Sequence, residues 1–421
     1  MGKEKPRTAL DAALFKRKYV HFDSPLPRNE CRALVTSPAA VSTHAFFPFL
    51  RHDIVRRKLK RSSKGRVTKS LKIRDIRYAA HADAAIYGYY NFLLCELYEK
   101  KVIELGLSEN VTAFRSLAKS NVDFANEAFE WIVANRPCKA FGFDVTDFFG
   151  SLNHTTLKKA WSSLLGLSSM PEDHYSVFRS LTKHSSVELI AARRALGLSR
   201  SSLARIDRLC SAAEFRTKIR NSGLVFSNRS NSGIPQGSPI SAALSNIYML
   251  EFDKNLKHQV EQAGGMYRRY CDDILVLVPN SVTEDFESMV AGELAKLSLS
   301  MQTTKTLSCH FDKQGTKTTP SLQYLGLTYD GTSVHLRSSG ISRFYLKMRR
   351  GVSQLKNSKR SDGSTALIVQ RRRTLLNKYS EHTPATGRSY FKYVRLATKK
   401  TQSPSIKRQL RRHRRRLADL M

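Results

Sequence analysis

Residues 266–278 of this chain read MYRRYCDDILVLV, and this stretch decides the fold. An acidic pair, Asp272 and Asp273, stands between two strand-like runs, and the second run is continuously apolar. The pattern predicts a β-hairpin whose tip carries both carboxylates and whose second strand is buried. Because carboxylates beside a buried strand are costly unless a cation compensates them, the hairpin tip is a candidate metal site.

A second strand is predicted within KAFGFDVTDFF, residues 139–149. Bulky residues alternate there with small ones and with Asp144, which predicts one bulky buried face and one small face carrying a carboxylate. Nucleotidyl transfer by two divalent ions needs carboxylates from two or more segments held on rigid strands. Asp144, Asp272 and Asp273 form such a set. On their own, these three aspartates are as compatible with an ordinary exposed turn as with a metal site.

The charge of the chain points to a polyanionic partner. Its 421 residues include 71 Lys and Arg against 35 Asp and Glu, a formal net charge of +36. Nucleic acid is the first candidate and an acidic membrane surface the second. No apolar run approaches the ~20 residues of a membrane helix, and the N-terminus shows no apolar secretory core. The six cysteines form no C-x-x-C pair, which predicts reduced thiols in a cytoplasmic protein.

Helical segments are predicted on either side of the two strands. Residues 78–102 and 121–134 are typical of packed helices, the latter with Asn121 or Asp123 as its cap. Residues 155–222 and the chain from about Gly340 onward are predicted to be helical and basic. Within 231–257 a Gly/Pro turn precedes a helix that Ser238 is expected to cap, with Pro239 in the first turn.

Six motifs, in order along the chain, resemble those of reverse transcriptases. They are KIRDI at 72–76, FGFDVTDFFGSLNH at 141–154, NSGIPQGSPISAALSNIYM at 231–249, YCDD at 270–273, LSLSMQTTKT at 297–306 and LQYLGL at 322–327. The combination of P-Q-G with Y-x-D-D is highly specific, and chance agreement of all six in order is negligible. Two positions depart from the family pattern: Ser298 stands where Gly is common, and Gln302 where Asn is common.

The resemblance implies a catalytic set. Asp144 and Asp272 would ligate both of two Mg²⁺ ions, for which Mn²⁺ is an alternative. Asp273 would complete the box with a lesser metal role, and the main-chain carbonyl of Val145 would face a metal. Lys305 would neutralise or protonate the leaving pyrophosphate, although a solvent-exposed lysine is the alternative interpretation.

The resemblance also implies a nucleotide pocket. Phe149 would act as a steric gate that rejects a 2′-hydroxyl, with a plain core phenylalanine as the alternative. Lys72 and Arg74 would hold the triphosphate, since Arg suits bidentate phosphate contact; generic surface basicity is the alternative for both. The full implied pocket consists of Lys72, Arg74, Asp147, Phe148, Phe149, Gln236 and Gly237.

An α+β, right-hand polymerase fold follows from the resemblance, with fingers, a palm with an antiparallel sheet, and a helical thumb. The expected divisions are an N-terminal extension at 1–50, fingers at 51–139, a first part of the palm at 140–154, a helical insertion at 155–230, the rest of the palm at 231–335, and a basic thumb and tail at 336–421. Two basic stretches predict RNA contacts through Arg56, Arg57, Lys58, Lys60, Arg61, Arg411, Arg412, Arg414 and Arg415.

Among reverse transcriptases, the compact outline and the text KIRDIRYAAHAD resemble most the bacterial type 2 defence-associated group. That likeness implies antiphage function, a cognate structured non-coding RNA as partner and template, dNTP substrates and a cDNA product. The alternatives are a retron or intron-type enzyme without a defence role, a catalytically silent RNA-binding scaffold, and an RNA-directed RNA polymerase, which the PQG turn and Phe149 oppose. The oligomeric state and the priming mechanism stay open.

Overall fold

A four-stranded antiparallel sheet forms the centre of the protein. The computed structural model describes residues 8–14, 17–61, 67–302, 306–315, 320–360, 365–380 and 389–420. The strand order is β6-β7-β3-β8, with β3 at Cys138–Asp144, β6 at Met266–Tyr270, β7 at Asp273–Pro279 and β8 at Leu307–Phe311. The hairpin predicted around Asp272 is therefore present, and its second strand lies beside β3.

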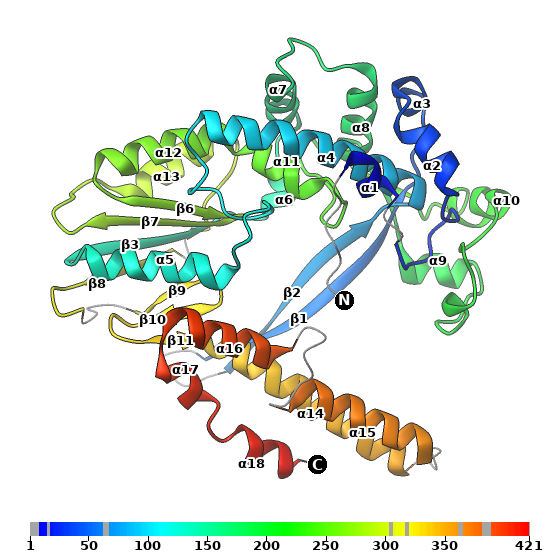
Figure 1. Ribbon diagram of the computed structural model, residues 1–421. Helices are drawn as coiled ribbons and strands as arrows, with labels where there is room; N and C mark the ends of the chain where they lie inside the picture. Colours follow the sequence, from blue (N-terminus) through cyan, green and yellow to red (C-terminus); the bar gives the residue numbers. More distant parts are fainter. Residues whose placement is uncertain are drawn as a thin grey trace.

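Both faces of this sheet are buried. Helices α12 (Leu250–Gln262) and α13 (Phe286–Lys296) lie over one face, and α5 (Asn121–Ala134) lies over the other (Figure 1). Along β7, Ile274, Val276 and Val278 belong to the core on one side, whereas Leu275 and Leu277 belong to the core on the other. Because successive side chains of a strand point to opposite faces, a sheet covered on both sides requires an unbroken apolar run.

The fingers are built on a long two-stranded ribbon. Strand β1 (Phe49–Arg61) pairs antiparallel with β2 (Val67–Tyr78), and the sheet continues through β4 (Ser185–Glu188) to β5 (Phe226–Ser227). Helix α4 (His81–Glu104) follows β2 directly and packs into the main core. In Figure 1 the ribbon leaves the helical layer and runs down toward the thumb helices.

The hydrophobic core on the α5 side of the palm sheet extends into the thumb. A small antiparallel sheet of β9 (Leu322–Tyr324), β10 (Leu327–Tyr329) and β11 (Val334–Leu336) joins the palm to the C-terminal helices. These helices are α14 (Ser338–Arg360), α15 (Thr365–Tyr379), α16 (Tyr390–Thr401), α17 (Pro404–Gln409) and α18 (His413–Ala418). The α+β class, with an antiparallel palm sheet and a helical thumb, is as predicted.

Short helices complete the described chain. They are α1 (Ala9–Ala13), α2 (Arg28–Val35), α3 (Pro38–Ser42), α6 (Phe148–Ser151), α7 (His154–Leu164), α8 (Glu172–Thr182), α9 (Leu189–Ala195), α10 (Ala212–Glu214) and α11 (Ser241–Tyr248), with a 3₁₀ turn at Ser202–Ala204 and a π-helical turn at Phe215–Arg220. Within the described residues, none of the helices is both long and apolar enough to cross a membrane.

Three local predictions need correction. The cap of α5 is Ser120, which exchanges hydrogen bonds with Asp123 three residues later, so neither predicted residue is the N-cap. Helix α11 begins at Ser241 rather than after Ser238, and the Ser241 hydroxyl donates to the Pro235 carbonyl of the preceding turn. The segment 155–222 is not wholly helical, since β4 interrupts it to pair with β1.

Candidate active site

Asp144 and the hairpin tip meet across the central sheet. In the register of β3 and β7, Asp144 lies opposite Asp273. The main-chain N–H of Val145 donates to the carbonyl oxygen of Asp272 at 3.4 Å. Asp144 and Asp272 are half-buried and Asp273 is exposed. The fold thus brings the main chain of Asp144 beside that of the Asp272–Asp273 pair, which the sequence placed on a separate segment.

The tip of the hairpin is a tight left-handed turn. Cys271 has φ 61°, a conformation that few non-glycine residues adopt. Burial, and then the negative charge of Asp272, raises the pKa of the Cys271 thiol to about 12. The thiol is therefore neutral near pH 7, and Cys271 packs against the main core as a small side chain.

A third segment holds Asp144 from the other side. The N–H of Gln302 donates to the carbonyl oxygen of Asp144 at 2.8 Å, and the N–H of Thr146 donates to Ser300 at 2.9 Å. The main chain that directly follows the Asp144 Cα is therefore fixed. Lys305, the predicted pyrophosphate contact, lies outside the described residues.

The donor chemistry of this site fits Mg²⁺. Asp144, Asp272 and Asp273 supply carboxylate oxygens, the ligands that Mg²⁺ prefers, and none of the three is fully buried. No group of three or more His, Cys, Asp or Glu side chains in the described chain is already gathered as a metal cluster. Magnesium usually takes one or two carboxylates together with substrate phosphates, so a fully assembled protein cage is not required.

The two phenylalanines after β3 have different environments. Phe148 is 4% exposed and belongs to the main core. Phe149 is half-buried at its edge, and its carbonyl oxygen accepts a hydrogen bond from Ile234 at 2.9 Å. Before them, exposed Asp147 adopts a left-handed φ of 40°. Of the two rings, only that of Phe149 remains available to a nucleotide, so the structure separates Phe148 from the rest of the predicted pocket.

The P-Q-G turn docks on the end of β2. The N–H of Arg77 donates to the carbonyl oxygen of Gln236 at 2.8 Å. Gly237 has φ 117°, and a Cβ there would lie 2.8 Å from the Arg77 carbonyl oxygen. Only glycine fits this close approach. The turn that carries Gln236 is thus held between the palm and the fingers ribbon.

Lys72 and Arg74 lie farther along β2, on the ribbon. Both are half-buried, and because they are two residues apart they share one face with Arg56, the register partner of Lys72. Burial, followed by the charges of Arg74 and of Arg343 on α14, lowers the pKa of Arg56. Guanidinium groups from the fingers and the thumb are therefore close enough to repel one another, as expected of a surface that binds an anion.

A family model supports this arrangement. The model described as "Reverse transcriptase (RNA-dependent DNA polymerase)" matches residues 188–329. Residues 188–329 are thus similar to the reverse transcriptase domain that this model describes. The matched range includes Gln236, Asp272 and Asp273, whereas Asp144 precedes its first residue. No curated protein matches the chain.

Solved structures similar to this chain include two telomerases and a viral polymerase. They are apo telomerase from Candida tropicalis truncated from its C-terminal domain, telomerase from Candida albicans in complex with a TWJ fragment of telomeric RNA, and an insertion-loop deletion mutant of the RNA-dependent RNA polymerase of a human picobirnavirus. Identities are 10%, 12% and 13%, and TM-scores are 0.39, 0.39 and 0.40. The similar regions cover 67%, 87% and 79% of this chain, and 55%, 61% and 56% of those chains. The chain therefore spans less than two thirds of the length of each.

The predicted RNA contacts come from two separate parts of the sequence, β1 and the C-terminal residues around α18. Arg56 is exposed on β1, whereas the side chains of Arg57, Lys58, Lys60 and Arg61 lie outside the described part of the structure. Arg411, Arg412 and Arg415 are exposed around α18, and the side chain of Arg414 is likewise outside the described part.

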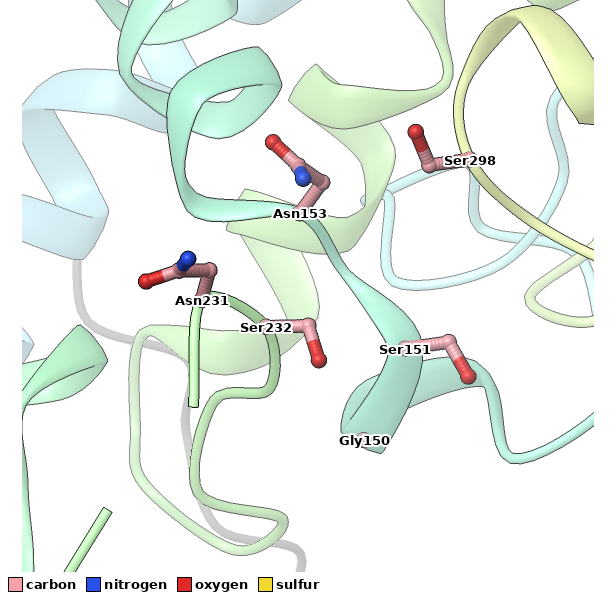
Figure 2. A pocket seen from close by; sticks show the side chains of 6 residues that line it. All are labelled: Gly150, Ser151, Asn153, Asn231, Ser232 and Ser298. Atoms are coloured by element: carbon pink, nitrogen blue, oxygen red, sulfur yellow. The ribbon is translucent and has the colours of Figure 1, made fainter. Parts of the chain in front are cut away.

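A polar pocket of about 400 Å³ adjoins the turn after β3 (Figure 2). Its lining consists of Gly150, Ser151, Asn153, Asn231, Ser232 and Ser298. Amides and hydroxyls surround the opening, and no charged side chain lines it. Since none of the three aspartates borders it, this pocket is separate from the carboxylate site.

Sequence reasoning missed the residues that support the candidate site. Arg77 donates to Asp75 at 2.7 Å and to Nε2 of His184 at 2.8 Å. Arg269, directly before the Y-x-D-D box, is fully buried and forms an ion pair with Asp253. The signal was an arginine within an otherwise buried strand, since arginine is almost never fully buried unless it is paired.

Proposed function

We propose that the protein is an RNA-directed DNA polymerase that copies a cognate structured non-coding RNA into cDNA. The observation that carries this proposal is the register pair of Asp144 and Asp273, with Asp272 tied by its carbonyl to the next residue of β3. Carboxylates from two rigid strands at one sheet end are what two-metal nucleotidyl transfer needs. The division into fingers, palm and thumb at the residue boundaries given above is part of the proposal.

In this function, the carboxylates of Asp144 and Asp272 would hold two Mg²⁺ ions, and Mn²⁺ is an alternative. Asp273 is the third, more exposed carboxylate, and the Val145 carbonyl would lie beside the ions. Bound divalent ions activate the primer 3′-hydroxyl and neutralise the leaving pyrophosphate. The hydrogen bonds at Val145 and at Asp144 orient the carboxylates before substrate arrives. Lys305 would assist departure of the pyrophosphate.

The incoming nucleotide would lie between the palm and the fingers ribbon. Gln236 and Gly237 would line its base and sugar side, where the absence of a side chain on Gly237 lets the main chain come close. Phe149 would meet the 2′ position and exclude a hydroxyl group. Lys72 and Arg74 would contact the triphosphate from the ribbon, where bidentate arginine contact suits phosphate oxygens. Asp147 completes the proposed pocket.

A dedicated RNA partner would explain the charge. A net charge of +36 gives strong, salt-sensitive affinity for RNA, because each neutralised phosphate adds about 0.7–0.9 to the salt slope. The contacts proposed for it are Arg56, Arg57, Lys58, Lys60, Arg61, Arg411, Arg412, Arg414 and Arg415. The likeness of the motifs to type 2 defence-associated reverse transcriptases supports a role in antiphage defence in the bacterial cytoplasm.

Primer extension tests the catalytic part of the proposal. Purified protein should incorporate dTTP on poly(rA)/oligo(dT) with Mg²⁺, and Asp272→Asn should lower the rate at least about 10³-fold, because several kcal/mol of transition-state charge stabilisation is lost. Asp207→Asn, at an exposed aspartate in the segment 155–230, is the matched control and should keep the wild-type rate. Full activity of folded Asp272→Asn would sink the metal assignment, and an inactive wild type would favour the RNA-binding scaffold.

Sequencing the bound nucleic acids tests the template and the defence role. Protein purified from a bacterial host carrying its native locus should retain one enriched RNA and cDNA complementary to it. The cDNA should be absent from the Asp272→Asn variant, whereas the RNA should remain bound. Phage plaque numbers should fall in cells with the wild-type locus and recover with the variant. Finding no enriched RNA would refute the cognate-partner proposal.

A further inference from the structure

Arg269 lies at the end of β6, one residue before the Y-x-D-D box, and is completely buried. Its Nε and Nη2 donate to the two carboxylate oxygens of Asp253, both at 2.6 Å. Asp253 lies on α12 and is also fully buried. The hydroxyl of Tyr267 donates to the same carboxylate at 2.5 Å. The guanidinium is therefore fixed by a bidentate pair, and burial makes that pair costly to break from one side.

The remaining guanidinium nitrogen reaches the hairpin tip. Nη1 of Arg269 donates to the carbonyl oxygen of Cys271 at 3.1 Å and to the side-chain oxygen of Asn246 at 3.2 Å. Cys271 is the residue held at φ 61°. Directly after this turn comes Asp272, whose carbonyl oxygen accepts from Val145. A chain of contacts therefore runs from Asp253, through Arg269 and the Cys271 carbonyl, to the carboxylate-bearing residue.

The main chain of Arg269 is fixed as well. Its N–H donates to Asn110 at 2.7 Å, and its carbonyl oxygen accepts from the N–H and the hydroxyl of Thr112 at 3.0 and 3.1 Å. Strand β6 is at the edge of the palm sheet. Asn110 and Thr112 therefore supply the main-chain hydrogen-bond partners that a further strand would otherwise provide. Because the main chain of Arg269 is held in this way, its guanidinium has little freedom to move and keeps the Cys271 carbonyl in one position.

We propose that Arg269 is a positioning residue, which holds the Cys271 carbonyl so that the left-handed turn presents Asp272 toward Asp144. The inference rests on the proposed function, because a set orientation of Asp272 matters only to a site that uses its carboxylate. Asp253 acts through Arg269 and touches neither substrate nor the reacting atoms. A guanidinium is needed because it can grip a carboxylate through two nitrogens while a third donates elsewhere.

The variant Arg269→Lys distinguishes the effect of the positive charge beside Asp253 from the effect of the hydrogen bond to the Cys271 carbonyl. A lysine keeps a positive charge beside Asp253, but a single ammonium group cannot reproduce the fixed fork of the guanidinium. The matched control is Arg268→Lys at the adjacent position of β6. Arg268 is also buried, and its guanidinium lies 3.7 Å from the carboxylates of Glu109 and Glu127 instead. Both variants place a lysine in the same strand, and only one loses the contact with Cys271.

Amide hydrogen exchange gives a readout that needs no activity. In Arg269→Lys, the peptide containing Val145 should exchange about 10-fold or more faster, since loosening the tip weakens the bond to the Asp272 carbonyl. In Arg268→Lys this peptide should exchange at the wild-type rate. In primer extension with dTTP, Arg269→Lys should lower kcat on the order of 10²-fold, the scale for a displacement of about 1 Å, with KM nearly unchanged.

The outcomes separate this inference from the proposed function. Faster exchange at Val145 with an inactive wild type would support the positioning role and refute polymerase activity. Wild-type exchange and wild-type kcat in folded Arg269→Lys would overturn the positioning role alone. If Arg269→Lys does not fold, the same measurements are made on the double variant Asp253→Leu/Arg269→Met, which removes both buried charges. This variant is expected to fold, because buried ion pairs are often replaced by apolar residues without loss of stability. If neither variant folds, the network is a requirement for folding and the proposal fails.

Discussion

The Cβ position of Gly237 lies 2.8 Å from the carbonyl oxygen of Arg77, although the two residues come from the palm and the fingers ribbon. The hydrogen bond from Arg77 to Gln236 fixes the same contact one residue earlier. This approach of two main chains is what orients the P-Q-G turn. At Gly237 even the smallest side chain should therefore be destabilising.

Gly237→Ala should destabilise the protein by about 2–4 kcal/mol, because a methyl group adds a clash to the strain of a positive φ. Urea denaturation measures the loss. Gly223→Ala is the matched control: its φ is also positive, at 69°, but nothing lies within 4 Å of its Cβ position. The control should lose only about 1 kcal/mol. Equal losses in the two variants would show that contact with Arg77 is not what excludes a side chain.

Phe149→Ala should admit ribonucleotides. Removal of the half-buried ring opens space at the proposed 2′ position, so the ratio of kcat/KM for dTTP to that for UTP should fall by about 10-fold or more, about 1.4 kcal/mol of discrimination. Phe148→Ala is the control, since its ring is buried in the core. It should cost about 3–5 kcal/mol of stability and leave the nucleotide ratio unchanged. An unaltered ratio in Phe149→Ala would remove the gate assignment.

Ser298→Gly should stabilise the protein. Ser298 follows α13 with φ 58°, and Leu299 donates back to Leu294 at 2.9 Å, so the serine occupies the helix-ending position that favours glycine. Relief of the left-handed strain, offset by the greater entropy of unfolded glycine, should yield about 0.5–1 kcal/mol. Thermal unfolding measures it. Ser298→Ala keeps the Cβ and removes the hydroxyl, so a gain in that variant would contradict the strain argument.

His184 should make stability depend on pH. Burial, and then the charge of Arg77, lowers its pKa to about 4. The unfolded chain binds this proton near the ordinary value of 6.5, so between pH 6.5 and 4 the unfolded state holds more protons than the folded state. Stability is therefore complete above pH 6.5 and falls as the pH drops, by about 2–3 kcal/mol at pH 4.5.

Urea denaturation from pH 7 to pH 4.5 tests this slope. His184→Gln, which stays neutral, should have a shallower decline by about the same 2–3 kcal/mol. His258→Gln, on the exposed side of α12, should follow the wild type. A His184→Gln slope identical to that of the wild type would place the acid sensitivity elsewhere, for example at buried His21, whose pKa burial lowers to about 3.

The residues of the hairpin, the P-Q-G turn and the strand of Asp144 were accessible from sequence, because each is encoded locally. An unbroken apolar run predicts a strand covered on both faces, and alternation predicts which side chains share a face. The first residues of helices were harder to predict from the sequence. The cap of α5 moved to Ser120 and the start of α11 moved to Ser241, because hydrogen bonds to neighbouring residues decide those positions.

The sequence by itself determined that this chain has strands carrying Asp144 and the Asp272–Asp273 pair, in an order of motifs resembling that of reverse transcriptases. Only the tertiary structure decided that Asp144 lies opposite Asp273, that Gly237 packs against Arg77, and that Arg269 is paired with Asp253 beneath the hairpin tip. The physical reason is the distance along the chain over which each interaction acts. Propensity and periodicity act over a few residues, whereas strand register and buried ion pairs depend on segments far apart in the chain.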